Sequence, residues 1–217
     1  MDELLRRLRA IDTTTLSDAA KHLPVMDPGI RPLRLGLLMV GRAVPVAAHD
    51  DLLGVIEGLA RAGAGDVLVV DGGGSARALA GELFGNEALR KGLAGIVIDG
   101  YCRDTNSLRE LPMPYYARGS VPNAAPAKVL PGEPRTVRCG GVHVSPGDIL
   151  IGDDDGIVVG TPDQLAAVID AVEALQATEA SMLAGIRDGK SLFERLDYEE
   201  HVARLRAGEE SSLHFTD

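Results

Sequence analysis

The chain has 217 residues, of which 45% are hydrophobic and 25% charged; this is enough to bury a core as a single domain and excludes a disordered protein. Its formal net charge of −10 argues against a nucleic-acid partner, whose phosphates require clustered Lys and Arg. Two cysteines are too few for a disulfide framework. The acidic first residues are unlike a secretory signal peptide. No apolar run reaches the roughly 20 residues that a membrane-spanning helix requires. We therefore expect a cytoplasmic protein without a membrane partner.

The N-terminal segment predicts two short helices. Leu4–Ile11 is amphipathic, and the threonines at 13–15 interrupt it. Thr15 and Asp18 have the spacing of a capping box, so we expect the second helix to run from Thr15 through His22.

A strand and a helix follow a proline-rich loop. Leu37–Val46 predicts a strand with a bulge or bend near Gly41 and Pro45. Leu52–Ala62 predicts a helix that one of the two preceding Asp residues caps. His49 is expected to be a solvated loop residue.

The centre of the chain has the size and pattern of a βαβ crossover. Val67–Val70 and Gly95–Ile98 are short β-branched runs, each followed by Asp-Gly, and they predict buried strands. Ala76–Leu93 between them has helical spacing. The glycine run after Asp71 predicts a tight turn, because Arg77 replaces the third glycine of a dinucleotide fingerprint and no P-loop Lys follows.

The remaining chain predicts short elements and then long helices. We expect a helical turn at Thr105–Glu110, a strand at Tyr115–Gly119 and a proline-rich loop at Val121–Pro134. Three short strands are expected next, at Val142–Val144, Ile149–Ile151 and Ile157–Val159. Two helices are expected last, at Pro162–Arg187 and Leu192–Leu205. Asp155-Gly156 is a hairpin signal, and the Asp run at 153–155 does not have the spacing of a calcium loop.

Polar residues gather at two points of the crossover. Gly81-Glu82-Leu83 lies in the connection, and Arg103-Asp104 follows the second strand. A cation and two carboxylates beside a glycine predict a site for a small anion and a metal. No lysine lies in a well-defined strand, so a Schiff-base mechanism is not expected.

Glu82, followed 21 positions later by Arg103-Asp104, resembles the signature of the RraA-like family, which includes the 4-hydroxy-4-methyl-2-oxoglutarate aldolases. The likeness covers about residues 13–160, and the C-terminal helices more loosely. Further blocks agree in family order: TLSDA, GDVLVVDG, GIVIDGYCRD, LPMPYYARG, CGGVHVSPGDIL and DDDGIVV.

The resemblance implies one compact α/β domain over residues 1–217, of the type likened to swivelling phosphohistidine domains, with a core at about 13–160 and a C-terminal helical segment at about 161–207. It also implies a homotrimer or a dimer of trimers. An acidic residue of a neighbouring subunit would then complete the site, the candidates being Glu194, Glu199 and Glu200.

The resemblance further implies an aldolase that requires Mg²⁺ or Mn²⁺, acts on 2-oxo acids and releases pyruvate, with oxaloacetate decarboxylation as a second activity. Arg103 would bind the pyruvyl carboxylate and Asp104 would ligate the metal. Gly81, Glu82, Leu83 and Phe84 would form the substrate loop, with Glu82 holding metal-bound water. Val121–Lys128 departs from the usual glycine-containing family segment, at the part of the site that faces the far end of the substrate.

Two other functions remain open. Some members of the family regulate an RNA-degrading enzyme by binding it, and an acidic chain suits a basic protein surface. The complete set of Glu82, Arg103 and Asp104 favours the enzyme. A family scaffold that acts on another keto acid or hydroxy acid is the third alternative.

Overall fold

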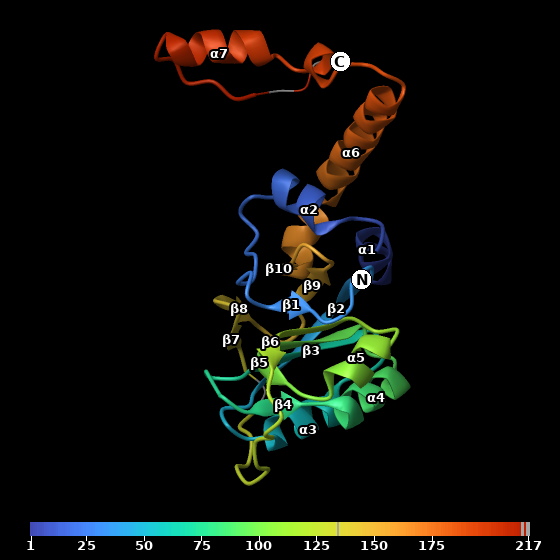
Figure 1. The fold of residues 1–217 in the computed structure, drawn as a ribbon, viewed down its shortest axis with the longest axis vertical. Helices are drawn as coiled ribbons and strands as arrows, with labels where there is room; N and C mark the ends of the chain where they lie inside the picture. The colour runs from blue at the N-terminus through green and yellow to red at the C-terminus, as the bar shows by residue number, and fades with distance from the viewer. Residues whose placement is uncertain (134, 214, 216–217) are drawn as a thin grey trace. The chain divides into compact units, whose positions relative to one another are not determined.

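A mixed β-sheet with helices on one face forms the body of the protein (Figure 1). The structure, a computed structural model, describes residues 1–133, 135–213 and 215. Within them the strands of the main sheet lie in the order β1-β6-β5-β3-β2-β9-β10, and β4 pairs with β5 outside this path. The expected α/β class is confirmed.

Four parallel strands form the middle of the sheet: β2 (Met39–Ala47), β3 (Asp66–Asp71), β5 (Gly95–Cys102) and β6 (Tyr115–Ser120). Val67–Val70 of β3 and Gly95–Ile98 of β5 are β-branched-rich and buried throughout, because both faces of the sheet are covered there. The other strands are β1 (Arg31–Pro32), β4 (Ala78–Ala80), β7 (Val137–Cys139), β8 (Val142–Val144), β9 (Ile149–Gly152) and β10 (Ile157–Gly160).

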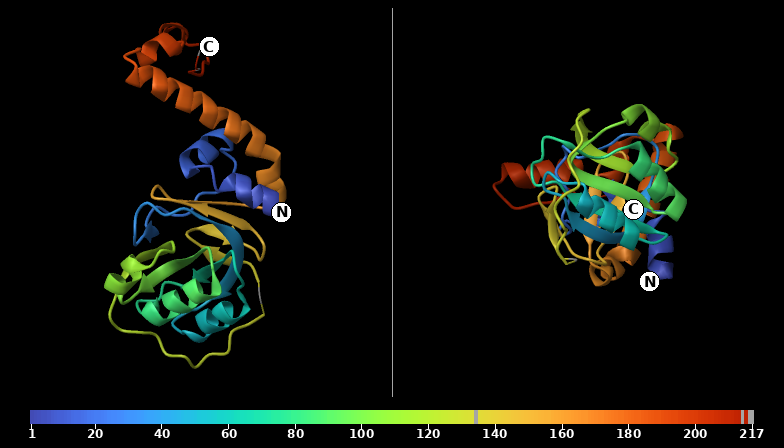
Figure 2. Two further views of the ribbon diagram at one scale, coloured as in Figure 1. Left: turned by 90° about the vertical axis from the view of Figure 1, so that its right-hand side faces the viewer. Right: turned by 90° about the horizontal axis from the view of Figure 1, so that it is seen from below.

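Three helices pack together on one face of the sheet (Figures 1 and 2). They are α3 (Leu53–Arg61), α4 (Glu82–Lys91) and α5 (Thr105–Glu110). On the opposite face, the β7–β8 hairpin packs its valines against the sheet. A third cluster joins β9 and β10 to the N-terminal helices α1 (Asp2–Leu8) and α2 (Thr13–Ala19) and to the first turns of α6 (Pro162–Arg187).

The expected helix over Ala76–Leu93 is correct only in its second part. Residues 78–80 form strand β4, which pairs in parallel with the end of β5, and α4 begins at Glu82. Ala78 also bonds to the loop that follows β6, since its N–H donates to Asn123 O and its carbonyl accepts from Ala125 N. These partners, distant in sequence, override the helical propensity of an Ala-Leu-Ala segment.

Near the N-terminus, one local prediction is wrong and another is wrong in part. Helix α2 begins at Thr13, and Asp12 caps it by accepting a hydrogen bond from the Thr15 N–H at 2.7 Å; Thr15 is therefore not the cap. Strand β2 has no bulge at Gly41 or Pro45, because its ladder with β9 is continuous from Met39 to Arg42 and its ladder with β3 is continuous from Arg42 to Ala47. The pairing of β2 with β9 ends at Arg42, so the missing N–H of Pro45 breaks no ladder.

Most of the other elements are confirmed with small shifts of their ends. Helix α5 spans Thr105–Glu110 as expected, and β9 and β10 form the hairpin around Asp155-Gly156. The capping box at Thr161 is present, with Gln164 and Thr161 exchanging hydrogen bonds. The last expected helix is two pieces, a 3₁₀ turn at Leu192–Arg195 (η1) and α7 (Tyr198–Arg206).

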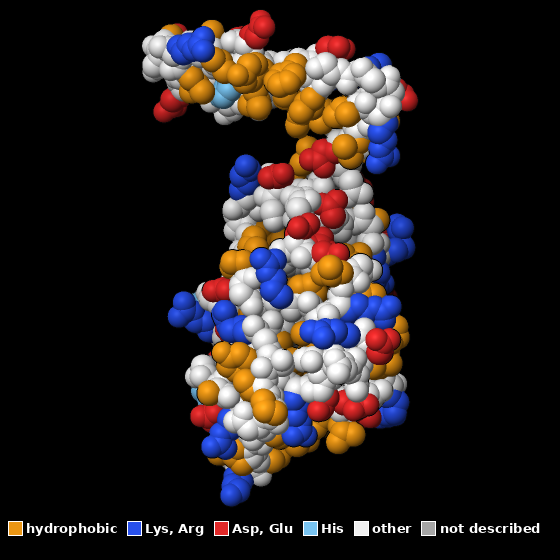
Figure 3. Space-filling model, in the orientation of Figure 1, with side chains coloured by type: hydrophobic (Ala, Val, Ile, Leu, Met, Phe, Trp, Pro, Cys, Tyr) orange, Lys and Arg blue, Asp and Glu red, His pale blue; other side chains and the backbone are white. Residues whose placement is uncertain are grey.

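The chain divides into two compact units, Met1–Val172 and Glu173–Asp217, and the boundary falls inside α6. No described residue of the second unit is buried. Figure 3 shows hydrophobic side chains gathered on one face of that unit. Its large exposed apolar residues are Leu183, Ile186, Leu192, Phe193, Tyr198, Leu205, Leu213 and Phe215.

Among the described residues, no helix combines the length and the apolar composition that crossing a membrane requires. Position 134, the last residue of the expected proline-rich loop, lies outside the described residues.

Candidate active site

The predicted site residues meet where β4 and β5 end. These two strands are parallel, so their carboxyl ends deliver Gly81 and Arg103 to the same edge of the sheet. The Arg103 N–H donates to Ala80 O at 3.0 Å, which fixes one segment against the other. Asp104 follows with a φ of +58°, a left-handed conformation that turns the chain from β5 into α5.

The carboxylate of Asp104 lies against the start of α4. Its Oδ2 accepts the Glu82 N–H at 3.1 Å and lies 3.5 Å from Arg103 Nε. Gly81 makes this approach possible, because a Cβ there would lie 2.4 Å from Asp104 Oδ2. Any side chain at position 81 would therefore displace the Asp104 carboxylate.

A pocket of about 110 Å³ opens beside these residues. This is smaller than the roughly 300–1,000 Å³ typical of sites for drug-sized ligands, and it suits a small organic acid. Five of the six predicted site residues line it: Gly81, Leu83, Phe84, Arg103 and Asp104. Glu82 does not line the pocket; it contributes its backbone N–H to Asp104, and its side chain is exposed. The chemical roles assigned to these residues stay predictions.

Sequence reasoning missed four other residues that line the pocket, here called the apolar wall: Leu52, Ala78, Ala80 and Ala124. The wall is held by backbone hydrogen bonds between distant segments, since Leu52 N donates to Pro126 O at 2.7 Å and Ala78 bridges to Ala124. Only the departure of Val121–Lys128 from the family pattern pointed to this region of the chain.

Asp51 ties the start of α3 to the same loop. Its Oδ1 accepts the Leu53 N–H at 2.9 Å, and its Oδ2 accepts the N–H groups of Lys128 at 2.7 Å and Val129 at 3.1 Å. Burial of the carboxyl favours its neutral form, but these three donors favour the charged form more strongly and lower the pKa of Asp51. The N-cap residue of α3 is Leu52, so the predicted Asp does not occupy the cap position; Asp51, one residue earlier, accepts the first N–H of the helix and also anchors the loop.

The donor set fits a hard divalent cation that keeps most of its water. In the described part of the chain, no three His, Cys, Asp or Glu side chains cluster to hold a metal ion by themselves. Asp104 uses Oδ2 for its protein contacts, and no described residue donates to its Oδ1. Mg²⁺ commonly binds through one or two carboxylates, with water and substrate oxygens as its other ligands. One free carboxylate oxygen beside a pocket meets that requirement.

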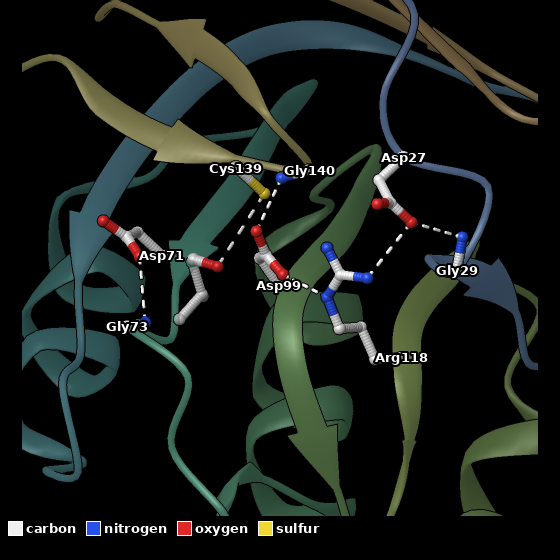
Figure 4. A network of polar contacts seen from close by, with 9 residues as sticks. Asp27, Gly29, Asp71, Gly73, Asp99, Arg118, Cys139 and Gly140 are labelled. Atoms are coloured by element: carbon white, nitrogen blue, oxygen red, sulfur yellow. Dashed lines mark hydrogen bonds and ion pairs between the residues drawn. The ribbon is translucent and has the colours of Figure 1, made fainter.

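A second polar cluster contains Asp71, the last residue of β3, with Asp99 inside β5 and Arg118 inside β6 (Figure 4). Arg118 Nε donates to Asp99 Oδ1, and its Nη1 lies 3.1 Å from Asp27 Oδ1. Asp99 Oδ2 also accepts the Gly140 N–H at 2.7 Å. Each charge in this cluster has a partner, so it joins the β-hairpin and the N-terminal loop to the sheet.

The glycine run beside this cluster is the tight turn that the sequence predicts. Asp71 Oδ1 accepts the Gly73 N–H at 2.9 Å, and Ser75 N donates to Gly72 O. His49 is half exposed, but its Nε2 lies 3.2 Å from Asp71 Oδ2, so it is not simply a solvated residue.

Neither cysteine is suited to nucleophilic catalysis. Burial raises the pKa of Cys102 to about 11 and also raises the pKa of Cys139. Both thiols therefore stay protonated near neutral pH, and the thiolate is the reactive form.

Comparison with known proteins identifies a family model and relatives that match the first unit. A family model described as RraA-like, Aldolase/RraA, matches residues 13–159. A curated relative from Thermus thermophilus, named 4-hydroxy-4-methyl-2-oxoglutarate aldolase, is 40% identical over 149 residues, which are 68% of this chain and 90% of the relative.

Two solved structures share the fold. The RNA-processing inhibitor RraA from Thermus thermophilus has a TM-score of 0.63 at 34% identity, over 68% of this chain and 91% of that one. RraAS2 from Streptomyces coelicolor, described as an unusual member of the RNase ES inhibitor RraA protein family, has a TM-score of 0.72 at 31% identity, over 82% of this chain and 95% of that one. The fold type expected from the sequence is confirmed.

Proposed function

Because the chain belongs to the RraA-like family, we propose that it is a divalent-metal-dependent aldolase that cleaves 4-hydroxy-2-oxo acids and releases pyruvate. This substrate class includes the acid for which the Thermus thermophilus relative is named. The observation that carries the proposal is the pairing of Arg103 and Asp104 in one small pocket at the end of β5. A guanidinium and a free carboxylate oxygen are the two groups that a metal-assisted reaction of a 2-oxo acid requires.

Arg103 binds the carboxylate of the substrate. Its contact with Asp104 is made through Nε, and among the described residues its two terminal nitrogens make no hydrogen bond or ion pair. Guanidinium and carboxylate form two parallel hydrogen bonds, which fix the plane of the carboxylate. The bond to be broken is thereby oriented with respect to the carbonyl group.

Asp104 would hold Mg²⁺ or Mn²⁺ through Oδ1. When bound, such an ion withdraws electron density from the 2-oxo group and favours negative charge on it.

Cleavage breaks the C3–C4 bond of the substrate. The proton of the 4-hydroxyl group leaves as C4 becomes a carbonyl, and the bonding electrons pass to C3 to give the enolate of pyruvate, which is then protonated at C3. We assign the first proton to the carboxylate of Glu82, reached through a water, because Glu82 begins α4 beside Asp104 and its side chain is exposed. Loss of CO₂ from oxaloacetate gives the same enolate, so we propose this second activity for the same site.

The alternative function is regulation of an RNA-degrading enzyme by protein binding. It is supported by the descriptions of the two structural relatives as RNase inhibitors. The predicted binding residues for a small acid are all present here, which favours the enzyme.

The test is pyruvate release from 4-hydroxy-2-oxo acids and from oxaloacetate. With Mg²⁺ or Mn²⁺ we expect turnover that a chelator abolishes and that added metal restores. Borohydride in the presence of pyruvate should not inactivate the protein, because no lysine is among the described residues that line the pocket. Irreversible trapping by borohydride would contradict the metal-dependent mechanism, and binding to an RNase without any pyruvate release would favour the alternative.

A further inference from the structure

Residues 123–129, here called the strap, belong to the loop after β6 and contribute Ala124 to the lining of the pocket. Hydrogen bonds on both sides of Ala124 join the strap to β4. Ala78 N donates to Asn123 O at 2.9 Å, and Ala125 N donates to Ala78 O at 3.0 Å. A strand therefore fixes the first part of the strap.

The last part of the strap is held by the carboxylate of Asp51. Its Oδ2 accepts the N–H groups of Lys128 at 2.7 Å and Val129 at 3.1 Å. The chain is open to solvent from this point, since Val129 is 63% exposed and Leu130 is 85% exposed. Asp51 is thus the anchor at the end of the strap that leaves the protein surface.

The same anchor is joined to the pocket through the next residue. Leu52 lines the pocket, and its N–H donates to Pro126 O in the middle of the strap at 2.7 Å. Asp51 itself is only 5% exposed, and its Oδ1 accepts the Leu53 N–H at 2.9 Å. A carboxylate accepts these bonds without donating any, and hydrogen bonds to a charged group are stronger than neutral ones.

We propose that Asp51 is a positioning residue of the active site: its carboxylate anchors the strap, and this anchor sets the affinity of the pocket for the 2-oxo acid. The proposed function is the premise of this inference, and Asp51 is assigned no contact with the reacting atoms. Arg103 and Asp104 are held by Ala80 O and Glu82 N instead. Loss of the anchor should therefore weaken substrate binding and leave the chemical step intact.

The kinetics of Asp51→Asn test this division. The amide has the size of the carboxylate but only one acceptor oxygen for the three N–H donors. With Mg²⁺ present, we expect KM for pyruvate release from 4-hydroxy-4-methyl-2-oxoglutarate to rise about tenfold, the lower end of what one lost hydrogen bond to a charged group costs. The kcat value and the Mg²⁺ concentration for half-maximal activity should not change. An unchanged KM, or a loss confined to kcat, would overturn the inference.

Asp148→Asn is the matched control. Asp148 Oδ2 accepts the Ser145 N–H at 2.7 Å in the turn between β8 and β9, and neither residue lines the pocket. This variant also loses a hydrogen bond between a carboxylate and the backbone, so its Tm should fall, but its KM should equal that of the wild type. An equal rise of KM in both variants would show that a general loss of stability, rather than the strap, changes binding.

Hydrogen exchange of backbone amides tests the anchor without turnover. The amides of Lys128 and Val129 should exchange faster in Asp51→Asn than in the wild type, because their shared acceptor is weakened. Coupling between the anchor and ligand binding is reciprocal, so Mg²⁺ with pyruvate should slow the exchange of these two amides in the wild type. The same exchange rates with and without pyruvate, or in wild type and variant, would overturn the inference.

The two readouts fail separately. If the wild type releases no pyruvate from 4-hydroxy-2-oxo acids or oxaloacetate, the aldolase proposal fails, and hydrogen exchange still decides the role of Asp51. Exchange that pyruvate and Mg²⁺ slow in the wild type but not in Asp51→Asn supports the anchor, and no slowing in the wild type overturns it. If the wild type is active and Asp51→Asn has the same KM, the aldolase proposal stands and the role of Asp51 is refuted.

Discussion

At the scale of single residues, the candidate site depends on two neighbours in the sequence with opposite charges. Arg103 and Asp104 both approach Gly81, and each keeps polar atoms free for a ligand. The site depends on the positions of these groups as well as on their charges, so we expect even conservative substitutions to lower its activity.

Arg103→Lys should lower kcat/KM for pyruvate release far more than its retained charge suggests. Lys lacks the planar fork that makes two parallel hydrogen bonds to a carboxylate. Loss of one charge-assisted hydrogen bond costs about 1.5–3 kcal/mol, or roughly ten- to a hundredfold in rate. Arg109→Lys, on α5 and outside the pocket, is the matched control and should retain full activity. A fully active Arg103→Lys would remove Arg103 from the site.

Gly81→Ala should impair catalysis while the protein remains folded. Its new Cβ would press on Asp104 Oδ2 and Arg103 Cγ, at 2.4 Å and 2.9 Å, so both side chains must move. Displacement of reacting groups by about 1 Å can cost on the order of a hundredfold. Gly132→Ala is the control, because no atom of the described residues lies within 4 Å of its added Cβ. Steady-state kinetics and Tm are measured for both; equal activity in the two variants would show that the close approach is unimportant.

At the scale of elements, the site is assembled by contacts between a helix start and a distant loop. Asp51 precedes α3 and bonds to Lys128 and Val129, while the next residue, Leu52, forms part of the pocket wall. The carboxylate is therefore expected to contribute to both stability and the shape of the site.

Asp51→Asn should destabilise the protein in a pH-dependent way. The amide has only one acceptor oxygen, so its NH₂ group must face at least one of the N–H donors. The folded-state pKa of Asp51 is lowered, so its stabilising contribution is present above the ordinary Asp pKa of about 3.9 and is lost as the pH falls through the folded value. The difference between wild type and variant in urea midpoint should be largest near pH 7 and should shrink below pH 4.

Asp18→Asn provides the comparison for that experiment, since Asp18 is exposed on α2. It should leave the midpoint nearly unchanged at both pH values. A pH-independent loss of stability in Asp51→Asn would show that packing, rather than the charge, is responsible.

At the scale of the whole molecule, the second unit lacks a core of its own. None of its described residues is buried, and it presents eight large apolar side chains to solvent. An exposed apolar surface of this kind is typical of a contact with another protein chain. Combined with the oligomers that the family resemblance implies, it leads us to propose a homotrimer or a dimer of trimers.

Light scattering at micromolar concentration should therefore give a mass of three or six chains. Phe193→Asp, at a residue 65% exposed in η1, should shift the protein to smaller species. Leu35→Asp, which changes a residue 69% exposed in the first unit, is the matched control. A monomer with full activity would contradict the proposal that Glu194, Glu199 or Glu200 of a neighbouring subunit completes the site.

Much of the fold could be predicted from the sequence because local pattern and tertiary environment agree. The β-branched runs of β3 and β5 suit strands buried on both faces, and the capping box before α6 specifies a helix start by itself. The resemblance to the RraA-like signature around Glu82 and Arg103-Asp104 implied six site residues, and five of them line one pocket. These sequence patterns lie in the same residues that form the strand or the helix start, so they can be interpreted without knowledge of the rest of the chain.

The tertiary structure decided the features that depend on distant partners. Ala78–Ala80 is a strand because β5 and the loop after β6 supply its hydrogen bonds. Asp12 caps α2 although Thr15 has the better local pattern, and Pro45 is accepted in β2 only because β9 ends before it. The apolar wall combines Leu52, Ala78, Ala80 and Ala124 from three segments of the chain, and only the segment of Ala124, within Val121–Lys128, carries a sequence signal of the site. These residues line one pocket because the fold brings the segments together, and no local pattern in the sequence indicates that contact.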